Sequence, residues 1–163
     1  MGPESMDDSV VIAVCGKGGV GKTSISAAMA RILSKNAEKR VLAIDADPAI
    51  GLAGSLGLRA VKTVDEIRTG LIERIKQGDG GDKDEILNRL DYEVFEALEE
   101  RDNLAFLAIG RPELEGCYCQ VNLFLKEIIQ SVASGFDYVV IDGEAGIEQV
   151  NRRVMERVSH LVL

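Results

Sequence analysis

The feature that most restricts how this chain can fold is a glycine-rich segment, 16–23, directly after the apolar run 10–15. The segment fills every position of the pattern G-x-x-x-x-G-K-[ST] with the residues Gly16, Lys17, Gly18, Gly19, Val20, Gly21, Lys22 and Thr23. In this pattern the glycines let successive backbone N–H groups turn toward an anion, and a following helix adds its positive N-terminal end. The sequence therefore predicts a buried parallel strand, a loop that binds a triphosphate, and a helix.

The side chains of this loop have different expected roles. Lys22 is expected to reach the β- and γ-phosphates, and the Thr23 hydroxyl is expected to hold Mg²⁺, which prefers oxygen ligands. Lys17 is not needed for either task, because backbone amides and Lys22 already serve the phosphates of the same chain. This additional lysine therefore needs a separate explanation.

The composition predicts one soluble domain. The chain has 163 residues and 46% hydrophobic content, which is enough for a sizeable core. No apolar run approaches the roughly 20 residues of a membrane span, so no membrane anchor is expected in this segment. The net charge of −8 repels nucleic acid phosphates and argues against nucleic acid partners. Three cysteines without an apolar signal segment indicate the reducing cytoplasm, with thiols free or bound to metal.

Alternating strand and helix patterns predict an α/β fold, with a mostly parallel sheet between two layers of helices. The expected strands are 10–15, 40–45, 104–109, 136–142 and 158–163, and the expected helices are 23–34, 64–76, 84–100 and 123–133. Apolar residues at helical spacing in 23–34 predict its buried face, namely Ile25, Ala28, Met29, Ile32 and Leu33. The glycine-rich tract 78–82 is expected to be a mobile loop.

The expected domain spans 10–163, after a disordered leader or tag at 1–9. Its last segment begins a strand that would leave apolar sheet surface exposed, so we expect the domain to continue beyond Leu163. Residues that select the nucleotide base would then lie outside this sequence.

Aspartates stand at the ends of two expected strands. Asp45 and Asp47 are two residues apart, so an extended backbone places their side chains on the same side, and Asp142 ends the strand 136–142. Mg²⁺ and an attacking water both favour carboxylates beside a γ-phosphate. An Asp-Pro turn or a plain strand end would also explain these residues, but the upstream phosphate loop favours a magnesium site at Asp45 and Asp142.

Cys117 and Cys119 form a C-x-C pair whose thiols would project together from an extended segment. Two thiolates are half of a tetrahedral site, so a two-fold dimer would be needed to complete a Cys₄ site for Zn²⁺ or Ni²⁺. A pair of ordinary cysteines remains the alternative. Cys15 is expected to be a core thiol and His160 a structural residue.

A lysine at position 17 resembles the deviant Walker A ATPases, which include nitrogenase iron protein and the chromosome and septum partitioning ATPases. The resemblance implies that Lys17 reaches across a two-fold interface to the partner's nucleotide and stabilises the transition state, as an arginine finger does. It also implies that Asp47 orients the attacking water and that Asp45 lies near the Mg²⁺ shell. The segments 49–52 and 142–146 resemble the two switches of that family.

One branch of this family is favoured by the combination of the segments 110–113, 116–119 and 144–148, followed by Arg152 and Arg153. These segments resemble the ATPases that help insert nickel into carbon monoxide dehydrogenase and related acetyl-CoA synthase enzymes. The resemblance implies ATP and Mg²⁺ as cofactors, an ATP-dependent homodimer, nickel or zinc held between subunits by Cys117 and Cys119, and delivery of nickel to a client enzyme coupled to hydrolysis.

Two other functions fit parts of the same pattern. An iron–sulfur scaffold ATPase would share the dimer geometry but usually carries C-x-x-C, and it would bind a coloured cluster. A partitioning or positioning ATPase would need a basic patch or an amphipathic helix to bind DNA or membrane. The acidic composition opposes DNA binding.

Overall fold

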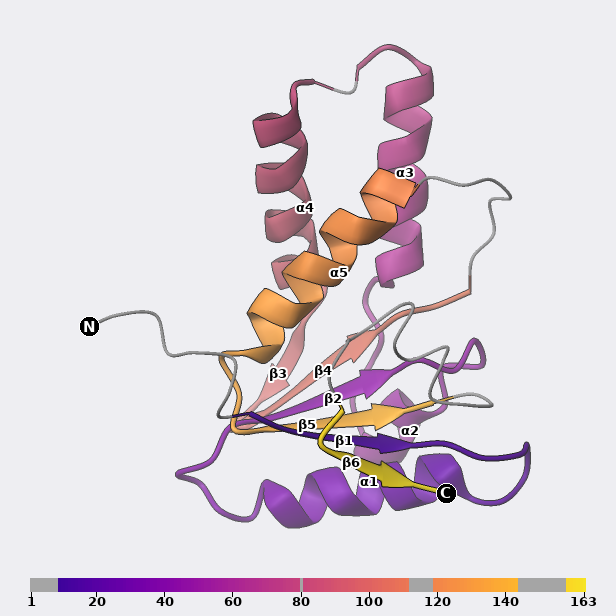
Figure 1. Ribbon diagram of the computed structural model, residues 1–163. Coiled ribbons are helices and arrows are strands. Elements are labelled where there is room, and N and C mark those ends of the chain that lie inside the picture. Colours follow the sequence, from indigo (N-terminus) through magenta and orange to yellow (C-terminus); the bar gives the residue numbers. More distant parts are fainter. Residues whose placement is uncertain (1–8, 80, 112–118, 144–157) are drawn as a thin grey trace.

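The computed structural model describes residues 9–79, 81–111, 119–143 and 158–163. Within these ranges a six-stranded sheet has the order β3-β4-β2-β5-β1-β6 (Figure 1). The strands are β1 (Val10–Val14), β2 (Val41–Asp45), β3 (Glu99–Arg101), β4 (Leu104–Ala108), β5 (Tyr138–Asp142) and β6 (His160–Val162). All five expected strands are present and the α/β prediction is confirmed, whereas β3 was not expected.

The sheet is parallel except at one edge, where β3 pairs antiparallel with β4. In the register of the central strands, Asp142 is the Cα partner of Val14 on β1 and of Asp45 on β2. Because parallel strands end at the same edge, the segments that follow β1, β2 and β5 emerge side by side. The Ala46 amide donates to the Asp142 carbonyl at 2.9 Å, and the Gly143 amide donates to the Val14 carbonyl at 2.8 Å.

Helices cover both faces of the sheet and complete a three-layer structure (Figure 1). The helices are α1 (Lys22–Leu33), α2 (Leu52–Leu56), α3 (Val64–Lys76), α4 (Lys83–Glu96) and α5 (Cys119–Ala133). Alternate side chains of β2 enter different cores, Val41 and Ala43 on the side of α1 and α2, Leu42 and Ile44 on the side of α3, α4 and α5. None of the described helices has the length and apolar character required to cross a bilayer.

The predicted buried face of α1 was partly wrong. Ile25 and Ile32 are 43% and 62% exposed, and Ala28 is exposed as well, whereas the buried positions are Lys22, Ser26, Ala27 and Ala30. Small side chains let the helix approach the sheet closely, and Met29 and Leu33 pack only at the margin of the core. The helix is therefore turned so that its small and polar residues, rather than its largest apolar ones, face the sheet.

The helices α3 and α4 both begin with a capping box. The Thr63 hydroxyl accepts from the Glu66 amide at 3.1 Å, and the Glu66 carboxylate accepts from the Thr63 amide at 2.7 Å. Asp82 caps α4 in the same way, so the last residue of the tract 78–82 is the N-cap of this helix. The mobility expected of the tract stays a prediction. Residue 80 lies outside the described residues.

The helix expected over 84–100 ends earlier, at Glu96. Residues Glu99–Arg101 instead form β3, because the chain turns at Asp102 and Asn103 and returns as β4. Asp102 has a φ of 55°, a left-handed conformation that aspartate tolerates better than most residues. The helix expected from 123 begins earlier, at Cys119.

Candidate nucleotide site

The segment between β1 and α1 has the backbone that an anion site needs. Gly16, Gly19 and Gly21 have φ angles of 149°, 80° and 92°, which side chains with a Cβ rarely adopt. Gly21 is the N-cap of α1, and no side chain caps this helix, unlike α3 and α4. Its first N–H groups are therefore not satisfied by a side-chain cap and can serve phosphate oxygens.

The two lysines of the loop differ in their surroundings. Lys22 is only 8% exposed, and its Nζ donates to the Lys17 carbonyl at 3.3 Å, within the loop that would hold the phosphates. The Lys17 side chain is exposed to solvent. Lys22 is thus placed for a ligand of its own chain, and Lys17 is accessible to a second molecule.

Asp142 is the buried carboxylate of this site. It has no exposed surface, and its Oδ1 accepts from the Ser26 hydroxyl at 3.2 Å. The Thr23 side chain lies close enough to influence its pKa. Its Oδ2 is buried, and none of the residues that the structure describes donates a hydrogen bond to it. Burial raises the pKa of this carboxyl, while the Thr23 and Ser26 side chains oppose the rise. A buried carboxylate oxygen without such a donor, beside a threonine hydroxyl and a phosphate loop, fits an oxygen-coordinated divalent cation such as Mg²⁺.

Asp45 is equally buried, but each of its oxygens already accepts one amide hydrogen bond. Oδ1 accepts from the Asp47 amide at 3.1 Å, and Oδ2 accepts from the Leu52 amide at 2.9 Å. The carboxylate thereby fixes both ends of the segment 47–52, which leads from β2 to α2. These two bonds fit the predicted place of Asp45 near the Mg²⁺ shell if it acts through water. They fit less well with direct binding of the ion by Asp45.

The pKa of Asp45 makes folding of the unliganded protein depend on pH. Burial raises this pKa from 3.8 to about 6, although the amides of Leu52 and Asp47 oppose the rise. The folded protein then binds the proton more tightly than the unfolded chain, so stability falls as pH rises between these values, by about 3 kcal/mol in total. We expect the free energy of unfolding in EDTA to fall less steeply from pH 4 to pH 7 in the Asp45→Asn variant than in the parent protein.

Urea unfolding at a series of pH values measures this difference. The comparison of slopes is the informative quantity, because asparagine also changes the bonds to the segment 47–52 and so shifts stability at every pH. Parallel curves for the two proteins would contradict the raised pKa.

Asp47 lies at the start of the segment between β2 and α2. It is half-buried, and its Oδ1 accepts from the Ala49 amide at 2.9 Å. Ile50 follows with a φ of 49°, a strained conformation for a β-branched residue that costs about 1–3 kcal/mol. A Cβ placed on Gly51 would lie 3.5 Å from the Thr23 methyl group, so this segment runs directly beside the phosphate loop. Asp47 is therefore held near the nucleotide site by a short, strained segment.

The family of the chain follows from a comparison with known domains. The model of the family AAA_31, described as an AAA domain, matches residues 9–162. The chain belongs to this AAA domain family. The matched residues of this AAA domain include the phosphate loop and all three aspartates of the site.

The relatives of this AAA domain include proteins that bind ATP. The uncharacterized ATP-binding protein MJ0685 of Methanocaldococcus jannaschii is 40% identical over 160 residues, which cover 94% of this chain and 60% of the relative. The carbon monoxide dehydrogenase accessory protein CooC of Rhodospirillum rubrum is 35% identical over 162 residues, which cover 93% of this chain and 61% of that protein. The chain thus spans about three fifths of the length of these relatives.

A solved structure shows the same fold. A ParA family ATPase from Chlorobium tepidum superposes with a TM-score of 0.61 at 22% identity, over 94% of this chain and 59% of that one. Together with the family match, this confirms the predicted α/β fold as that of a P-loop NTPase.

Several predicted site residues of the AAA domain lie outside the described residues. These are Cys117, the segments 112–113 and 144–148, and the pair Arg152 and Arg153, as well as the leader 1–8. Cys119 is the first residue of α5, so it is helical, whereas the prediction for the C-x-C pair assumed an extended segment. Among the described residues no group of three or more His, Cys, Asp or Glu side chains could hold a metal ion. The bridging Cys₄ site stays a prediction.

Cys15 and His160, which were expected to have structural roles, lie in the core and on an edge strand of the AAA domain. Cys15 is 2% exposed, and burial raises the pKa of its thiol, as expected for a core cysteine. His160 is exposed on the edge strand β6.

Two contributors to the site are absent from the sequence predictions. The Ser26 hydroxyl contacts Asp142, and the Leu52 amide contacts Asp45. Ser26 does carry a signal, because it follows Lys22 by one helical turn and therefore lies on the same face of α1. The Leu52 amide carries none, since every residue except proline has a backbone N–H.

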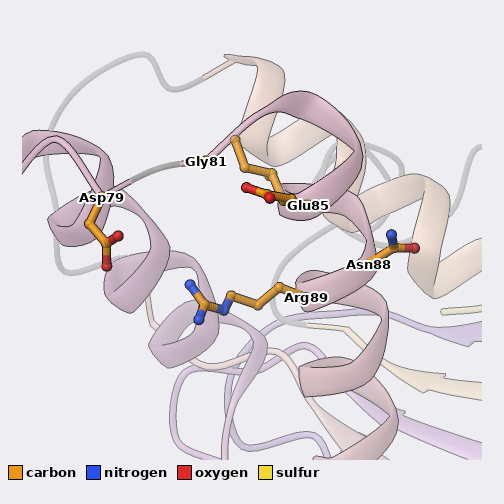
Figure 2. Close-up of a pocket in the computed structure, with 6 residues that line it drawn as sticks. Asp79, Gly81, Glu85, Asn88 and Arg89 are labelled. Carbon is orange, nitrogen blue, oxygen red and sulfur yellow. The ribbon is translucent and has the colours of Figure 1, made fainter.

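Two hollows border the second helical layer. One, of about 410 Å³, lies at the turn between α3 and α4 and is lined by Asp79, Gly81, Glu85, Ile86, Asn88 and Arg89 (Figure 2). Figure 1 shows this turn at the end of the helix pair that is far from the sheet. The Glu85 carboxylate there already accepts from the Asp82 amide in the α4 cap, at 3.3 Å.

The second hollow, of about 490 Å³, lies between the segment after β2 and α3. It is lined by Pro48, Ile50, Thr63, Asp65, Glu66, Thr69, Gly70, Glu73, Gly110 and Arg111. This hollow therefore borders the segment after β2, the start of α3 and the chain that leaves β4.

Proposed function

We propose that this domain belongs to an ATPase that dimerises on nucleotide binding and couples ATP hydrolysis to nickel insertion into carbon monoxide dehydrogenase or a related acetyl-CoA synthase. The ATPase part is supported by one observation above all, the buried Asp142 carboxylate beside Thr23, whose Oδ2 has no donor among the described residues. The nickel part is supported by the relationship to the carbon monoxide dehydrogenase accessory protein CooC.

The proposed reaction is attack of water on the γ-phosphorus of ATP, with cleavage of the bond to the β–γ bridging oxygen and release of ADP and phosphate. Backbone amides of the loop and Lys22 bind the phosphates. Thr23 and Asp142 would hold Mg²⁺, which would neutralise phosphate charge. Asp47 orients the water. Lys17 of one subunit stabilises the charge that develops on the nucleotide of the other.

The second hollow supports a connection between the nucleotide site and the cysteine segment. Pro48 and Ile50 border it from the segment after β2, and Gly110 and Arg111 border it from the end of β4, directly before the residues that lead to Cys117. A Cβ on Gly110 would lie 2.7 Å from the Thr63 hydroxyl, so the chain leaving β4 passes closely over the N-cap of α3. A change in the segment after β2 would therefore reach the start of the cysteine segment across a short distance.

Nickel is the cargo of the proposed function rather than a resident cofactor. Cys117 and Cys119 from each of two subunits would supply four thiolates, a donor set that suits Ni²⁺ and also Zn²⁺. Hydrolysis would separate the subunits and release the metal to the client enzyme.

The test is the metal content of the anaerobically purified protein at each oligomeric state, after loading with Ni²⁺ or Zn²⁺. We expect about one metal ion per two chains in the parent protein and none in the Cys117→Ala/Cys119→Ala variant. Light scattering after size-exclusion chromatography gives the oligomeric state, and elemental analysis of the same fractions gives the metal. The Cys15→Ala variant is the control, because it removes a thiol that is buried outside the proposed site.

Metal retained by the double variant would contradict the bridging Cys₄ site. A brown, oxygen-sensitive protein after reconstitution with iron and sulfide would favour an iron–sulfur scaffold instead. ATP hydrolysis without stoichiometric metal in any variant would leave the ATPase and remove the nickel function.

A further inference from the structure

The hydroxyl of Ser26 joins the first turn of α1 to the end of β5. Ser26 has no exposed surface, and its Oγ lies 2.9 Å from the Lys22 carbonyl and 3.2 Å from Oδ1 of Asp142. The second contact spans 116 residues of sequence. A fully buried hydroxyl at this place must be satisfied by these neighbours, because water does not reach it.

The hydroxyl has one proton and two acceptors within reach. The Lys22 carbonyl is four residues before Ser26 in an α-helix, so the Ser26 backbone amide already donates to it. No backbone amide among the described residues donates to the Asp142 carboxylate, and burial makes its charged form costly unless it is hydrogen-bonded. The carboxylate is therefore the acceptor that gains most from the hydroxyl proton.

We infer that Ser26 is a positioning residue for the magnesium site. Its hydroxyl holds Oδ1 of Asp142 and so fixes the rotation of the carboxylate. Oδ2, which has no donor among the described residues, is then the oxygen that would accept the cation or its water shell. This inference rests on the proposed ATPase function, since it concerns how the same site binds Mg²⁺. Replacing a residue that hydrogen-bonds to a metal ligand and orients it typically lowers metal affinity by 10- to 100-fold.

The chain offers a matched control on another helix. The Ser55 hydroxyl donates to the Gly51 carbonyl at 3.2 Å, which is the same bond to the carbonyl four residues earlier, but Ser55 is exposed. Ser55→Ala and Ser26→Ala therefore remove the same local bond, and only the second removes a donor to a carboxylate.

The experiment measures Mg²⁺ binding separately from nucleotide binding. A fluorescent ADP analogue is bound to each variant in EDTA to give the nucleotide affinity, and Mg²⁺ is then titrated into the complex. We expect Ser26→Ala to raise the Mg²⁺ concentration at half-saturation by about 10- to 100-fold and to change the affinity in EDTA by less than about twofold. Ser55→Ala should match the parent protein in both measurements.

Equal Mg²⁺ affinity in Ser26→Ala and the parent protein would overturn the inference. An equal loss of affinity with and without Mg²⁺ would also overturn it, because that result describes a hydroxyl that only supports the fold. If Ser26→Ala does not fold, Ser26→Cys carries the test, since a thiol fills the same space but is a weak donor. A parent protein without any Mg²⁺ effect would overturn the proposed ATPase function, whereas a Mg²⁺ effect that Ser26→Ala leaves unchanged overturns the Ser26 inference alone.

Discussion

Replacing Lys17 by alanine is expected to lower ATP turnover by about 10³- to 10⁵-fold and to abolish nucleotide-dependent dimerisation, while the single chain still binds nucleotide. The magnitude is that of an arginine finger removed from its phosphoryl-transfer site. The structure explains why turnover and dimerisation should be lost while nucleotide binding by the single chain is retained. Lys22 is buried against the loop carbonyl of Lys17 and serves its own chain, whereas the Lys17 side chain is exposed.

Turnover and oligomeric state are measured on the same preparation, by phosphate release and by light scattering with a non-hydrolysable ATP analogue. Lys35→Ala is the control, because Lys35 is also an exposed lysine and lies beyond the other end of α1. Dimerisation that persists in Lys17→Ala would defeat the assignment of this lysine to the partner's nucleotide. A nucleotide affinity that falls as far as turnover would instead place Lys17 in the site of its own chain.

The parts of this fold that the sequence could predict are those whose signals are local. The strand before the phosphate loop, the loop itself and the helix after it each have a pattern that depends on a few adjacent residues. Buried parallel strands such as β2 and β4 are continuous apolar runs, and both were predicted within one residue of their ends. The α3 helix, Val64–Lys76, was predicted at both ends, because its charged amphipathic pattern begins directly after the capping residue Thr63.

The parts that could not be predicted depend on packing between distant segments. The orientation of α1 follows from how close the helix lies to the sheet, so small residues are buried and Ile32 remains exposed. Periodicity alone favours the opposite choice, because it counts apolar residues without knowing the available space. The contact between Ser26 and Asp142 was missed for the same reason, since it joins residues 116 positions apart.

The magnesium assignment shows a further limit of sequence patterns. Asp45 and Asp142 look alike in the sequence, since each ends an apolar strand, and they are direct partners in the register of the sheet. The structure separates them, because Asp45 accepts from two amides, whereas one oxygen of Asp142 has no donor among the residues that the structure describes. Backbone donors carry no sequence signal, so only the folded chain distinguishes a carboxylate that anchors a loop from one that is available to a cation.

Asparagine in place of Asp47 is expected to lower kcat for ATP hydrolysis by about 10²- to 10⁴-fold, with nucleotide affinity and Mg²⁺ dependence close to those of the parent protein. The range is that of removing a group that positions or accepts a proton from a nucleophile. Asparagine retains the shape of the side chain and an oxygen that accepts from the Ala49 amide, a bond of 2.9 Å in the parent. The segment between β2 and α2 should therefore keep its conformation, and the lost charge is the main change.

Asp137→Asn is an informative control for this prediction, because Asp137 lies at the opposite end of β5 from Asp142. Its carboxylate bonds to Lys39 at 2.7 Å and to the Arg40 amide at 2.8 Å, and these bonds lower its pKa. Removing that charge should reduce stability and leave kcat unchanged. Asp47→Asn should instead lower kcat and leave stability close to that of the parent protein. Comparison of kcat and thermal unfolding for both variants separates the two roles. If Asp47→Asn retains kcat within threefold, the water must be oriented by another group, and the strained segment that holds Asp47 serves the fold rather than the reaction.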